Sequence, residues 1–486
     1  MPSDREGAIK HKRDDSLPEW SGALLYARRA LFWLASALSP WQHRHSSSQP
    51  EKLRPTAYLD GLRGFAAFLV YWHHHELWAH KPHQVRAMES SFGFNGEHYF
   101  LNIPGIGVLF HGGHFAVATF FVISGYVLSA KPISLIHAGD QAKLADNLGS
   151  ALFRRWLRLY LPVISTTFIY MTILQALRLE VDNVHLKPTY LEALGHWFRD
   201  LKNFSFIFQN CGVGFPSYNF HLWSIPVEFK GSIVVYTSLL AFARCTRNAR
   251  LWLQAGLVFY FLYVVDAYNC ALFTAGMLLS ELEQLSAHDD LPAFFDRFRP
   301  HKTAIFYSMF AVAMYLGGAP AVSANVEDMR KNPGWYYLSF LKPRVMSDVK
   351  WFFLFFAAAF LVASTPHIRW LKRFFETRFC QYLGRVSYSL YLVHGPVLWT
   401  LGDRLYAAVG FLKSSHDSFP HWINIFPLPW VGPLGMEVAF LVPHLILFPV
   451  TFYCAEVVTK AFDEPSVRFP QWLYKAVTAR KAKLPA

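Results

Sequence analysis

Long apolar segments recur along this chain from about residue 57 to residue 460. The candidates for helices that cross a bilayer are 57–79, 114–130, 152–177, 219–243, 251–265, 267–282, 303–318, 351–364, 382–401 and 436–459. A helix needs roughly 20 apolar residues to cross a membrane, and several of these segments are shorter. Because backbone polar groups must be satisfied inside lipid, the pattern predicts an all-α, polytopic integral membrane bundle of about ten helices.

The composition agrees with a membrane protein. Hydrophobic residues make up 53% of the sequence and charged residues 16%, whereas about 25% of the residues in a typical soluble domain are charged. The formal net charge is +13, but Lys and Arg gather at the ends of apolar segments, where they face anionic headgroups. The expected partner is therefore the lipid bilayer, and nucleic acid is not expected.

The chain is predicted to contain one membrane domain between two basic flanks. Residues 1–52 form a basic extension, in which the stretch 20–41 is an expected interfacial helix because arginines interrupt its apolar residues. The transmembrane domain covers residues 53–465, and residues 466–486 form a basic tail.

The distribution of Lys and Arg predicts the orientation of the bundle. With the amino terminus in the cytosol, the inner connecting segments contain more of these residues than the outer ones, and both basic ends also lie inside. We therefore expect a multi-pass protein of an endomembrane or the plasma membrane, with both termini cytosolic. The region 251–282 fits either one long helix or a tight hairpin near Asp266, and a single helix would reverse every later segment.

The five cysteines, at positions 211, 245, 270, 380 and 454, form no C-x-x-C pair. They therefore predict no zinc or redox motif. Cys211 and Cys270 both lie near the expected non-cytosolic face, so a disulfide between them and free packed thiols are the two alternatives.

The first apolar segment contains a stripe of ionisable residues. Arg63 and His74 are 11 residues apart, which is about three helical turns, so they share one face at a separation of roughly 16 Å. Asp60 and Tyr71 fall near the same face, and Asp60 is spaced to pair with Arg63. Ionisable residues inside a membrane segment mark functional sites, so this helix is predicted to carry catalytic and binding groups.

Two short motifs follow on the next apolar segments. Ser124 and Gly125 lack the G-x-S-x-G pattern of a nucleophilic serine, so we expect small residues that let helices approach closely. Arg155 and Arg158 project from one helix face, where their guanidinium groups suit phosphates. A positive-inside anchor accounts for the same pair and is favoured by charge placement alone.

The later segments carry four further candidates, which are His221, Trp223, Glu228 and His394. His221 and Glu228 are seven residues apart and share a face if the helix is regular, with Trp223 between them. A carboxylate at this position must face a cavity or a partner, and a structural ion pair accounts for it as well as catalysis does. His394 lies in the middle of an apolar segment and is expected to be a packed core residue. No metal site is predicted, because the outer histidines match no ligand spacing.

These ordered motifs resemble the membrane-bound acyltransferase 3 family over about residues 55–465. The matching pieces are Leu59 to Gly64, Arg63 with His74, Phe120 to Tyr126, Arg155 and Arg158 before Pro162, Trp223 to Glu228, and Ser387 to Leu392 with His394 and Pro396. The resemblance implies about ten transmembrane helices and the transfer of an acyl group, usually acetyl from acetyl-CoA, to a hydroxyl of a natural product, glycan or lipid. The chain looks similar to fungal members that serve secondary metabolism or cell-surface modification.

The family's arginine and histidine pair maps onto Arg63 and His74, because neither His73 nor His75 has the required spacing. As a hypothesis, His74 removes the proton of the acceptor hydroxyl, Arg63 neutralises the pantetheine end of the co-substrate or the oxyanion, and Glu228 orients a histidine or the acceptor. Arg155 and Arg158, with Arg63, are expected to bind acyl-CoA. The expected substrate-binding residues are Asp60, Tyr71, His221 and Trp223.

A proton-coupled transporter that uses the same intramembrane arginine, histidine and glutamate is the alternative hypothesis. It predicts two similar halves with broken helices, and the sequence contains no such repeat. For the enzyme, the expected partners are acetyl-CoA and a hydroxylated small molecule or glycan, with no metal.

Overall fold

The computed structural model describes residues 53–478 apart from residues 183, 209–215 and 322–324. All described elements belong to the unit Pro50–Ala486. The interfacial helix expected at 20–41 lies outside the described residues. Cys211 lies outside them as well, so its pairing with Cys270 stays one of two alternatives.

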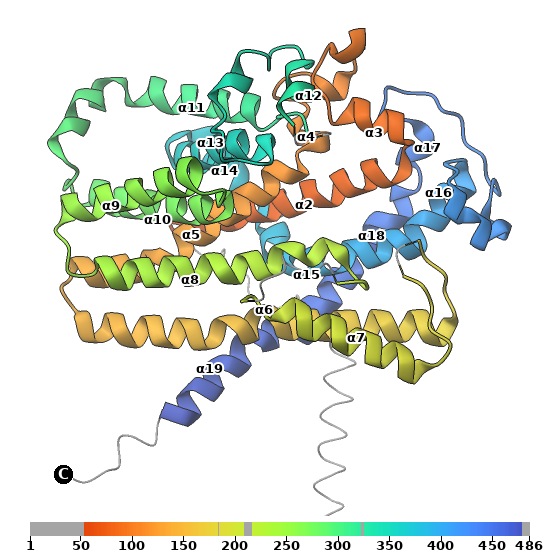
Figure 1. Cartoon of the computed structure of the whole chain (residues 1–486), viewed down its shortest axis with the longest axis horizontal. Coiled ribbons are helices and arrows are strands. Elements are labelled where there is room, and N and C mark those ends of the chain that lie inside the picture. The colour runs from red at the N-terminus through yellow and green to blue at the C-terminus, as the bar shows by residue number, and fades with distance from the viewer. Residues whose placement is uncertain (1–52, 183, 209–215, 322–324, 479–486) are drawn as a thin grey trace, which may run out of the picture. The chain divides into compact units, whose positions relative to one another are not determined.

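The described residues form a helical protein (Figure 1). Its α-helices are α2 (Ala57–Ala79), α3 (Pro82–Met88), α4 (Val108–His111), α5 (Gly113–His137), α6 (Gln141–Leu177), α7 (Tyr190–Ser205), α8 (Ser224–Phe242), α9 (Arg247–Phe259), α10 (Tyr268–Ala287), α11 (Lys302–Leu316), α12 (Val326–Arg330), α13 (Val349–Ser364), α14 (Arg369–Phe375), α15 (Arg378–Val397), α16 (Asp403–Val409), α17 (Val438–Leu441), α18 (His444–Val458) and α19 (Glu464–Thr478). A single β-bridge, between Val181 and Val184, is the one extended pairing in the described part of the chain. The predicted all-α class is confirmed.

Five helical stretches are long and apolar enough to cross a membrane, counted over the described residues. They are Gly113–His137, Gln141–Leu177, Phe220–Phe242, Val349–His367 and Val438–Thr478. The predicted count of ten spans is not confirmed. The helices α9 and α11 have only 13 and 15 residues, and α2, with 23 residues, carries ionisable groups that lower its hydropathy.

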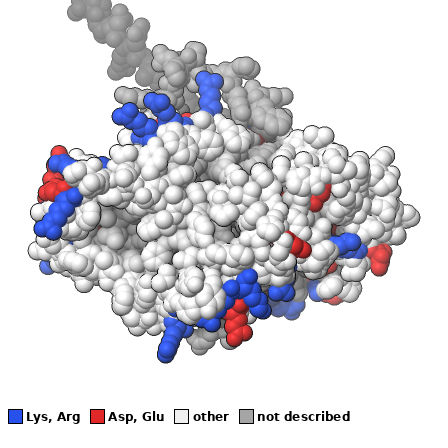
Figure 2. Space-filling model, turned by 90° about the horizontal axis from the view of Figure 1, so that it is seen from above, with Lys and Arg blue, Asp and Glu red and all other residues white. Residues whose placement is uncertain are grey.

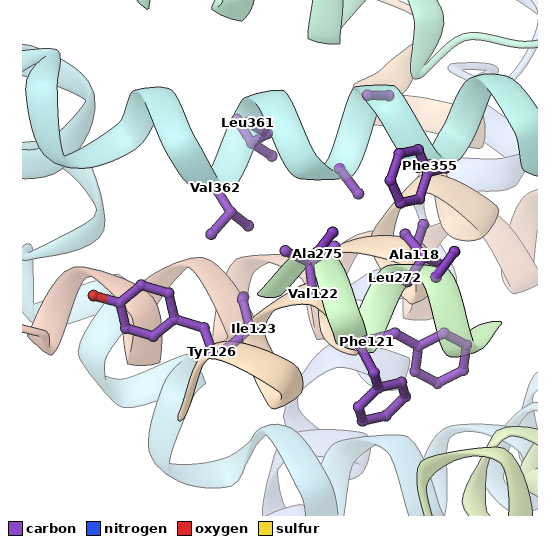
Figure 3. Packing of buried hydrophobic residues seen from close by; sticks show 14 of the residues in the cluster. Ala118, Phe121, Val122, Ile123, Tyr126, Leu272, Ala275, Phe355, Leu361 and Val362 are labelled. Carbon is purple, nitrogen blue, oxygen red and sulfur yellow. The ribbon is translucent and has the colours of Figure 1, made fainter. Parts of the chain in front are cut away.

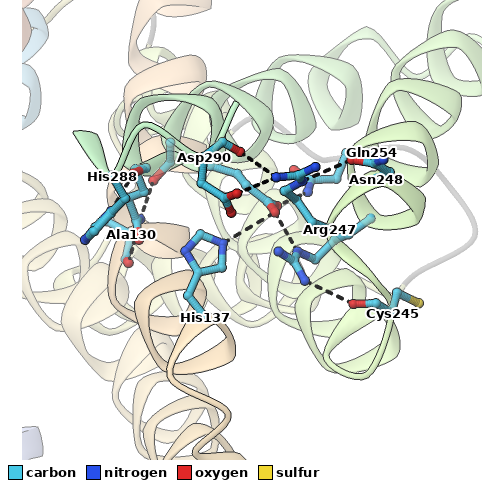
Figure 4. A network of polar contacts seen from close by, with 12 residues as sticks. Ala130, His137, Cys245, Arg247, Asn248, Gln254, His288 and Asp290 are labelled. Atoms are coloured by element: carbon cyan, nitrogen blue, oxygen red, sulfur yellow. Dashed lines mark hydrogen bonds and ion pairs between the residues drawn. The ribbon is translucent and has the colours of Figure 1, made fainter. Parts of the chain in front are cut away.

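The region 251–282 forms a helical hairpin, which was one of the two predicted alternatives. Helix α9 runs into a π-helical turn at Tyr260–Val264, the backbone becomes extended at Val265, and α10 follows. Arg250 and Gln254 of α9 both donate hydrogen bonds to Glu281 of α10. These contacts fix the two helices side by side, beside His137 of α5 (Figure 4).

Helices α5 and α10 are in close backbone contact. A Cβ atom added to Gly125 would lie 2.0 Å from the carbonyl oxygen of Phe273, and one added to Gly276 would lie 2.0 Å from that of Val122. Apolar side chains of α5, α10 and α13 fill the space around this contact (Figure 3). The close helix approach predicted at Ser124 and Gly125 is therefore confirmed.

Helices α2 and α15 also meet through glycines. A Cβ atom on Gly64 would lie 2.1 Å from the backbone nitrogen of Gly384, and one on Gly384 would lie 2.4 Å from the carbonyl oxygen of Asp60. Side chains on this face of α2 are consequently held against α15. In Figure 1, the axes of α2, α5, α6 and α8 are roughly aligned, with α5 and α6 antiparallel. A broad part of the face in Figure 2 carries few charged residues, as expected for contact with lipid.

Candidate functional site

The three consecutive histidines of α2 face three different neighbours. His73 faces α5, His74 faces α15 and the 3₁₀ turn η3 (Phe220–Trp223), and His75 faces α16. Successive residues of a helix are rotated by 100°, so this divergence follows from the helical geometry. Only His74 therefore shares a face with Arg63, as its spacing predicts.

His74 lies in a stack of three imidazole rings. Its ring centroid is 3.8 Å from that of His221 and 5.3 Å from that of His394, and the latter two are 4.7 Å apart. The ring planes differ by only 21° to 35°. Three elements far apart in the sequence, α2, η3 and α15, therefore bring one histidine each to a single point.

The backbone of α15 fixes the tautomer of His394. The Nδ1 atom of His394 lies 2.7 Å from the carbonyl oxygen of Tyr391. A carbonyl oxygen can only accept, so Nδ1 carries the proton and Nε2 has a free lone pair. That Nε2 atom is buried and has no hydrogen-bond partner, and the same is true of Nδ1 of His221. The stack thus contains buried nitrogen atoms that are available to a ligand or a proton.

Hydrogen bonds hold η3 against α15. The hydroxyl of Tyr391 donates to the carbonyl oxygen of His221 and lies 2.8 Å from the hydroxyl of Ser224. The side-chain amide of Asn219 donates to the carbonyl oxygen of Leu392 at 3.0 Å. His221 is therefore held in place by its backbone while its ring remains within the stack.

Arg63 lies toward the amino-terminal end of α2 and also faces α15. Its Nε donates to the Ser387 hydroxyl at 3.2 Å, and Nη2 donates to the carbonyl oxygen of Gly384 at 3.2 Å. Its Nη2 is also 3.2 Å from a carboxylate oxygen of Asp60, so the expected i, i+3 ion pair is present. Ser387 and His394 are two helical turns apart on α15, which is about 10 Å. Arg63 and His74 therefore face one neighbouring helix.

A second group of charges lies beside Arg63. Arg155 forms an ion pair with Glu228 and donates to the Ser232 hydroxyl at 2.8 Å. The Ser124 hydroxyl donates to the same carboxylate at 2.6 Å. Arg158 interacts electrostatically with Arg155, Arg63 and Asp463. Arg158 is therefore within electrostatic range of the guanidinium groups of Arg155 and Arg63, and the carboxylate of Asp463 offsets part of the repulsion.

Two predicted site residues, Glu228 and Tyr71, do not contact the imidazole stack, although their spacing along the chain suggested that they would. Glu228 contacts Arg155 and not His221, because His221 belongs to η3 and α8 begins only at Ser224, so the assumed seven-residue face does not exist. Tyr71 is fully buried and stacks on Phe448 of α18, away from the imidazole stack.

Trp223 and Asp60 lie at the edges of the arrangement. The Trp223 ring packs edge-on against Trp351 of α13 at 6.2 Å. Asp60 binds Arg54 as well as Arg63. His394 is buried and hydrogen-bonded, as expected for a packed core residue, and its ring also lies in the stack with His74. The only sequence signal for this role is its place in the motif that runs from Ser387 to Pro396.

The nitrogen atoms of the three stacked histidines lie within 4.8 Å of one another, so a metal ion must be considered there. Zinc binds imidazole nitrogen at about 2.0–2.1 Å in tetrahedral geometry, which separates two ligating rings by roughly 5 Å. The 3.8 Å separation of His74 and His221, with their faces turned toward each other, does not fit that arrangement. The stack is better suited to accepting and passing a proton.

A hollow of about 810 Å³ opens at the carboxyl-terminal end of α2. It is lined by Leu77 and Trp78, about one helical turn beyond His74, and by Lys413. The Lys413 ammonium lies 3.9 Å above the Trp78 ring. Burial lowers the pKa of Lys413 to about 8, and the carboxylates of Asp403 and Asp182 oppose this effect. Charged side chains of both signs line the hollow beside Leu77, Trp78 and Leu412, so it is suited to a polar or hydroxylated ligand.

Residues 56–448 match a family described as an acyltransferase domain. The chain is 28% identical to the O-acetyltransferase PaAT-1 of Phomopsis amygdali over 90% of this chain and 88% of that protein. It is 22% identical to the acyltransferase clz18 of Cochliobolus lunatus and 23% identical to the acyltransferase R4 of a Phoma species, in each case over 88% of this chain and 97% of the relative. No solved structure matches the chain.

Proposed function

Because the chain belongs to the acyltransferase 3 family and is an O-acyltransferase, we propose that it transfers an acetyl group from acetyl-CoA to a hydroxyl group of a small natural product or glycan, with His74 as the general base. The observation that carries this proposal is the stack of His74, His221 and His394, on the same side of α2 as Arg63. The family match favours acyl transfer over proton-coupled transport.

The reaction requires a group that takes a proton at neutral pH. An imidazole is the side chain best suited to this task. The neutral ring of His74 removes the proton as the acceptor oxygen attacks the thioester carbonyl carbon. The new C–O bond forms, the C–S bond breaks, and the departing thiolate takes the proton from the His74 imidazolium. His394, whose Nδ1 proton is held by Tyr391, presents Nε2 to the stack and stabilises that imidazolium.

The guanidinium cluster suits the phosphates of CoA. Phosphates bind planar, forked guanidinium groups through charge-assisted hydrogen bonds. Arg158 interacts electrostatically with both Arg155 and Arg63, and we propose that the three bind one polyanion. The phosphates and the thioester lie at opposite ends of the long CoA molecule, which agrees with the roughly 16 Å between Arg63 and His74 along α2. In this scheme Glu228 holds Arg155 in place, and Arg63 binds the phosphate end of CoA, because it lies too far along α2 from His74 to act on the reacting carbonyl.

The acceptor is proposed to enter from the other end of α2. The hollow beside Trp78 has a volume of about 810 Å³, within the usual range of small-molecule sites of roughly 300–1,000 Å³. With the guanidinium cluster on the cytosolic side, as the positive-inside rule favours, the two substrates approach His74 from opposite faces of the membrane. This orientation corresponds to a multi-pass protein with both termini in the cytosol. The relative PaAT-1 is named an O-acetyltransferase, which supports acetyl as the acyl group.

The proposal is tested by incubating the purified full-length protein with labelled acetyl-CoA and a panel of hydroxylated acceptors. We expect acceptor-dependent release of CoA and a labelled ester product. An Arg158→Gln variant should raise the KM for acetyl-CoA at least about tenfold, because a charge-assisted hydrogen bond contributes about 1.5–3 kcal/mol. Arg154→Gln is the matched control, since the Arg154 Nε donates to the Ser150 carbonyl oxygen on its own helix. Solute or proton flux in vesicles without any ester product would contradict the proposal.

A further inference from the structure

A second cluster of ligand-type side chains lies next to the imidazole stack but is separate from it. His73 of α2, Glu89 after α3 and His114 of α5 each offer one ligand atom, and these atoms lie within 4.8 Å of one another. The cluster takes no part in the proposed proton transfer, because His73 is turned about 100° away from His74 around α2, although Glu89 also lines the hollow proposed for the acceptor.

The two imidazole rings of this cluster have a separation that metal coordination would require. Two rings bound tetrahedrally to zinc at about 2.0–2.1 Å have centroids roughly 5 Å apart. The centroids of His73 and His114 are 5.4 Å apart, and their planes are nearly perpendicular, at 74°. The rings therefore do not stack face to face, unlike those of His74 and His221.

The ligand atoms of the cluster lack other partners. The Nδ1 atoms of His73 and His114 are buried without a hydrogen bond, and the side chain of His73 is only 2% exposed. Within the described residues, no hydrogen bond or ion pair involves the Glu89 carboxylate. Buried polar atoms nearly always have partners, so two buried imidazole nitrogens without partners, beside a half-buried carboxylate, indicate a missing ligand.

The backbone of α5 makes room for this arrangement. A Cβ atom on Gly113 would lie 2.4 Å from Cδ2 of His73, so only glycine lets the ring lie this close to α5. Lys350 is a cation that acts electrostatically on all three groups. Its ammonium is 2.8 Å from the carboxylate of Asp348, which offsets its charge.

We propose that His73, Glu89 and His114 bind a divalent transition metal ion, with Zn²⁺ as the best match to two imidazoles and one carboxylate. Such a ligand set leaves one position open for water or a substrate oxygen. The ion would cross-link α2, α5 and the segment after α3, and would thereby hold the part of α2 that carries His74. The proposal concerns metal binding alone and does not depend on the acyl-transfer chemistry.

The test is metal binding to the purified full-length protein. The protein is treated with a chelator, exposed to Zn²⁺ or Co²⁺ alone, and freed of unbound metal, after which bound metal is measured by elemental analysis and Co²⁺ by its visible absorption. We expect about one ion per chain in the wild type and a loss of at least tenfold in affinity in Glu89→Gln and His114→Ala. A cooperative thermal unfolding transition in these variants shows that they fold. Zn²⁺ should raise the midpoint of this transition in the wild type but not in the variants.

Two control variants distinguish this site from the imidazole stack and from exposed histidines. His83→Ala removes an exposed histidine of α3 and should bind metal as the wild type does. His394→Ala should also retain the ion. Loss of metal only in His394→Ala would place the ion in the imidazole stack and overturn the proposal. Equal binding by all variants would indicate an adventitious ion only, and an absence of binding by the wild type would also refute the site.

Discussion

The glycine contact between α2 and α15 makes a quantitative prediction. In a Gly64→Ala variant, the new Cβ atom would lie 2.1 Å from the backbone nitrogen of Gly384, whereas an ordinary contact begins at 3.4 Å. Neither atom is at the end of a flexible side chain, so the helices must separate by about 1.3 Å to relieve the clash, at a cost of about 1–3 kcal/mol.

That displacement should lower the catalytic rate. Gly64 lies between Arg63 and His74 on α2, and Gly384 precedes Ser387 and His394 on α15, so separation of the helices shifts the two sides of the proposed site. A misplacement of about 1 Å at a reacting centre costs about 10²-fold in rate. We therefore expect kcat for ester formation to fall by about that factor.

The assay compares turnover of labelled acetyl-CoA and the midpoint of thermal unfolding with those of Gly149→Ala. No atom lies within 4 Å of a Cβ placed on Gly149 of α6, so this control should keep full activity and gain about 0.5–1 kcal/mol of stability from the loss of a helical glycine. If Gly64→Ala has wild-type turnover and stability, the inferred contact between α2 and α15 is wrong.

Three further predictions concern charged groups. Replacing Glu281 by Gln leaves the buried guanidinium of Arg250 without its carboxylate. This variant should lose about 3–5 kcal/mol of stability in thermal or denaturant unfolding. The control Asp290→Asn removes an exposed partner of Arg247 and should change stability by less than about 1 kcal/mol. Because the pKa of Lys413 is lowered to about 8, its reaction with an amine-acylating reagent should be half-maximal near pH 8. Between pH 8 and the ordinary lysine pKa of about 10.4, the unfolded state binds more protons than the folded state. The free-energy cost of burying Lys413 should therefore fall as the pH rises through this window. A labelling midpoint near pH 10 would disprove the burial effect. Glu228→Gln should raise the KM for acetyl-CoA without a matching loss of kcat if the carboxylate only holds the neighbouring guanidinium, and a loss of kcat at unchanged KM would assign it to the chemistry.

Helical periodicity predicted the parts of the molecule that depend on a single helix. The shared face of Arg63 and His74, and the divergence of His73 and His75, follow from the 100° rotation per residue and are present in the structure. The close approach at Gly125 could be predicted for a similar reason, since small residues within an apolar helix allow tight packing.

The parts that depend on contacts between distant segments could not be predicted. His221, His394 and His74 meet only because three separate elements pack together, and no local pattern encodes this meeting. The predicted face shared by His221 and Glu228 failed because the chain forms a 3₁₀ turn before α8. The span count was not confirmed because several helices are short or carry buried ionisable groups, which weakens any estimate from hydropathy.

The role of His74 is tested most directly by single-turnover transfer of labelled acetyl from acetyl-CoA in His74→Ala, together with the affinity of that variant for acetyl-CoA. We predict a loss of about 10²–10⁴-fold in the transfer rate, an unchanged dissociation constant for acetyl-CoA, and partial recovery of the rate with added imidazole. Transfer by His74→Ala at the wild-type rate would contradict the assignment of this histidine as the base.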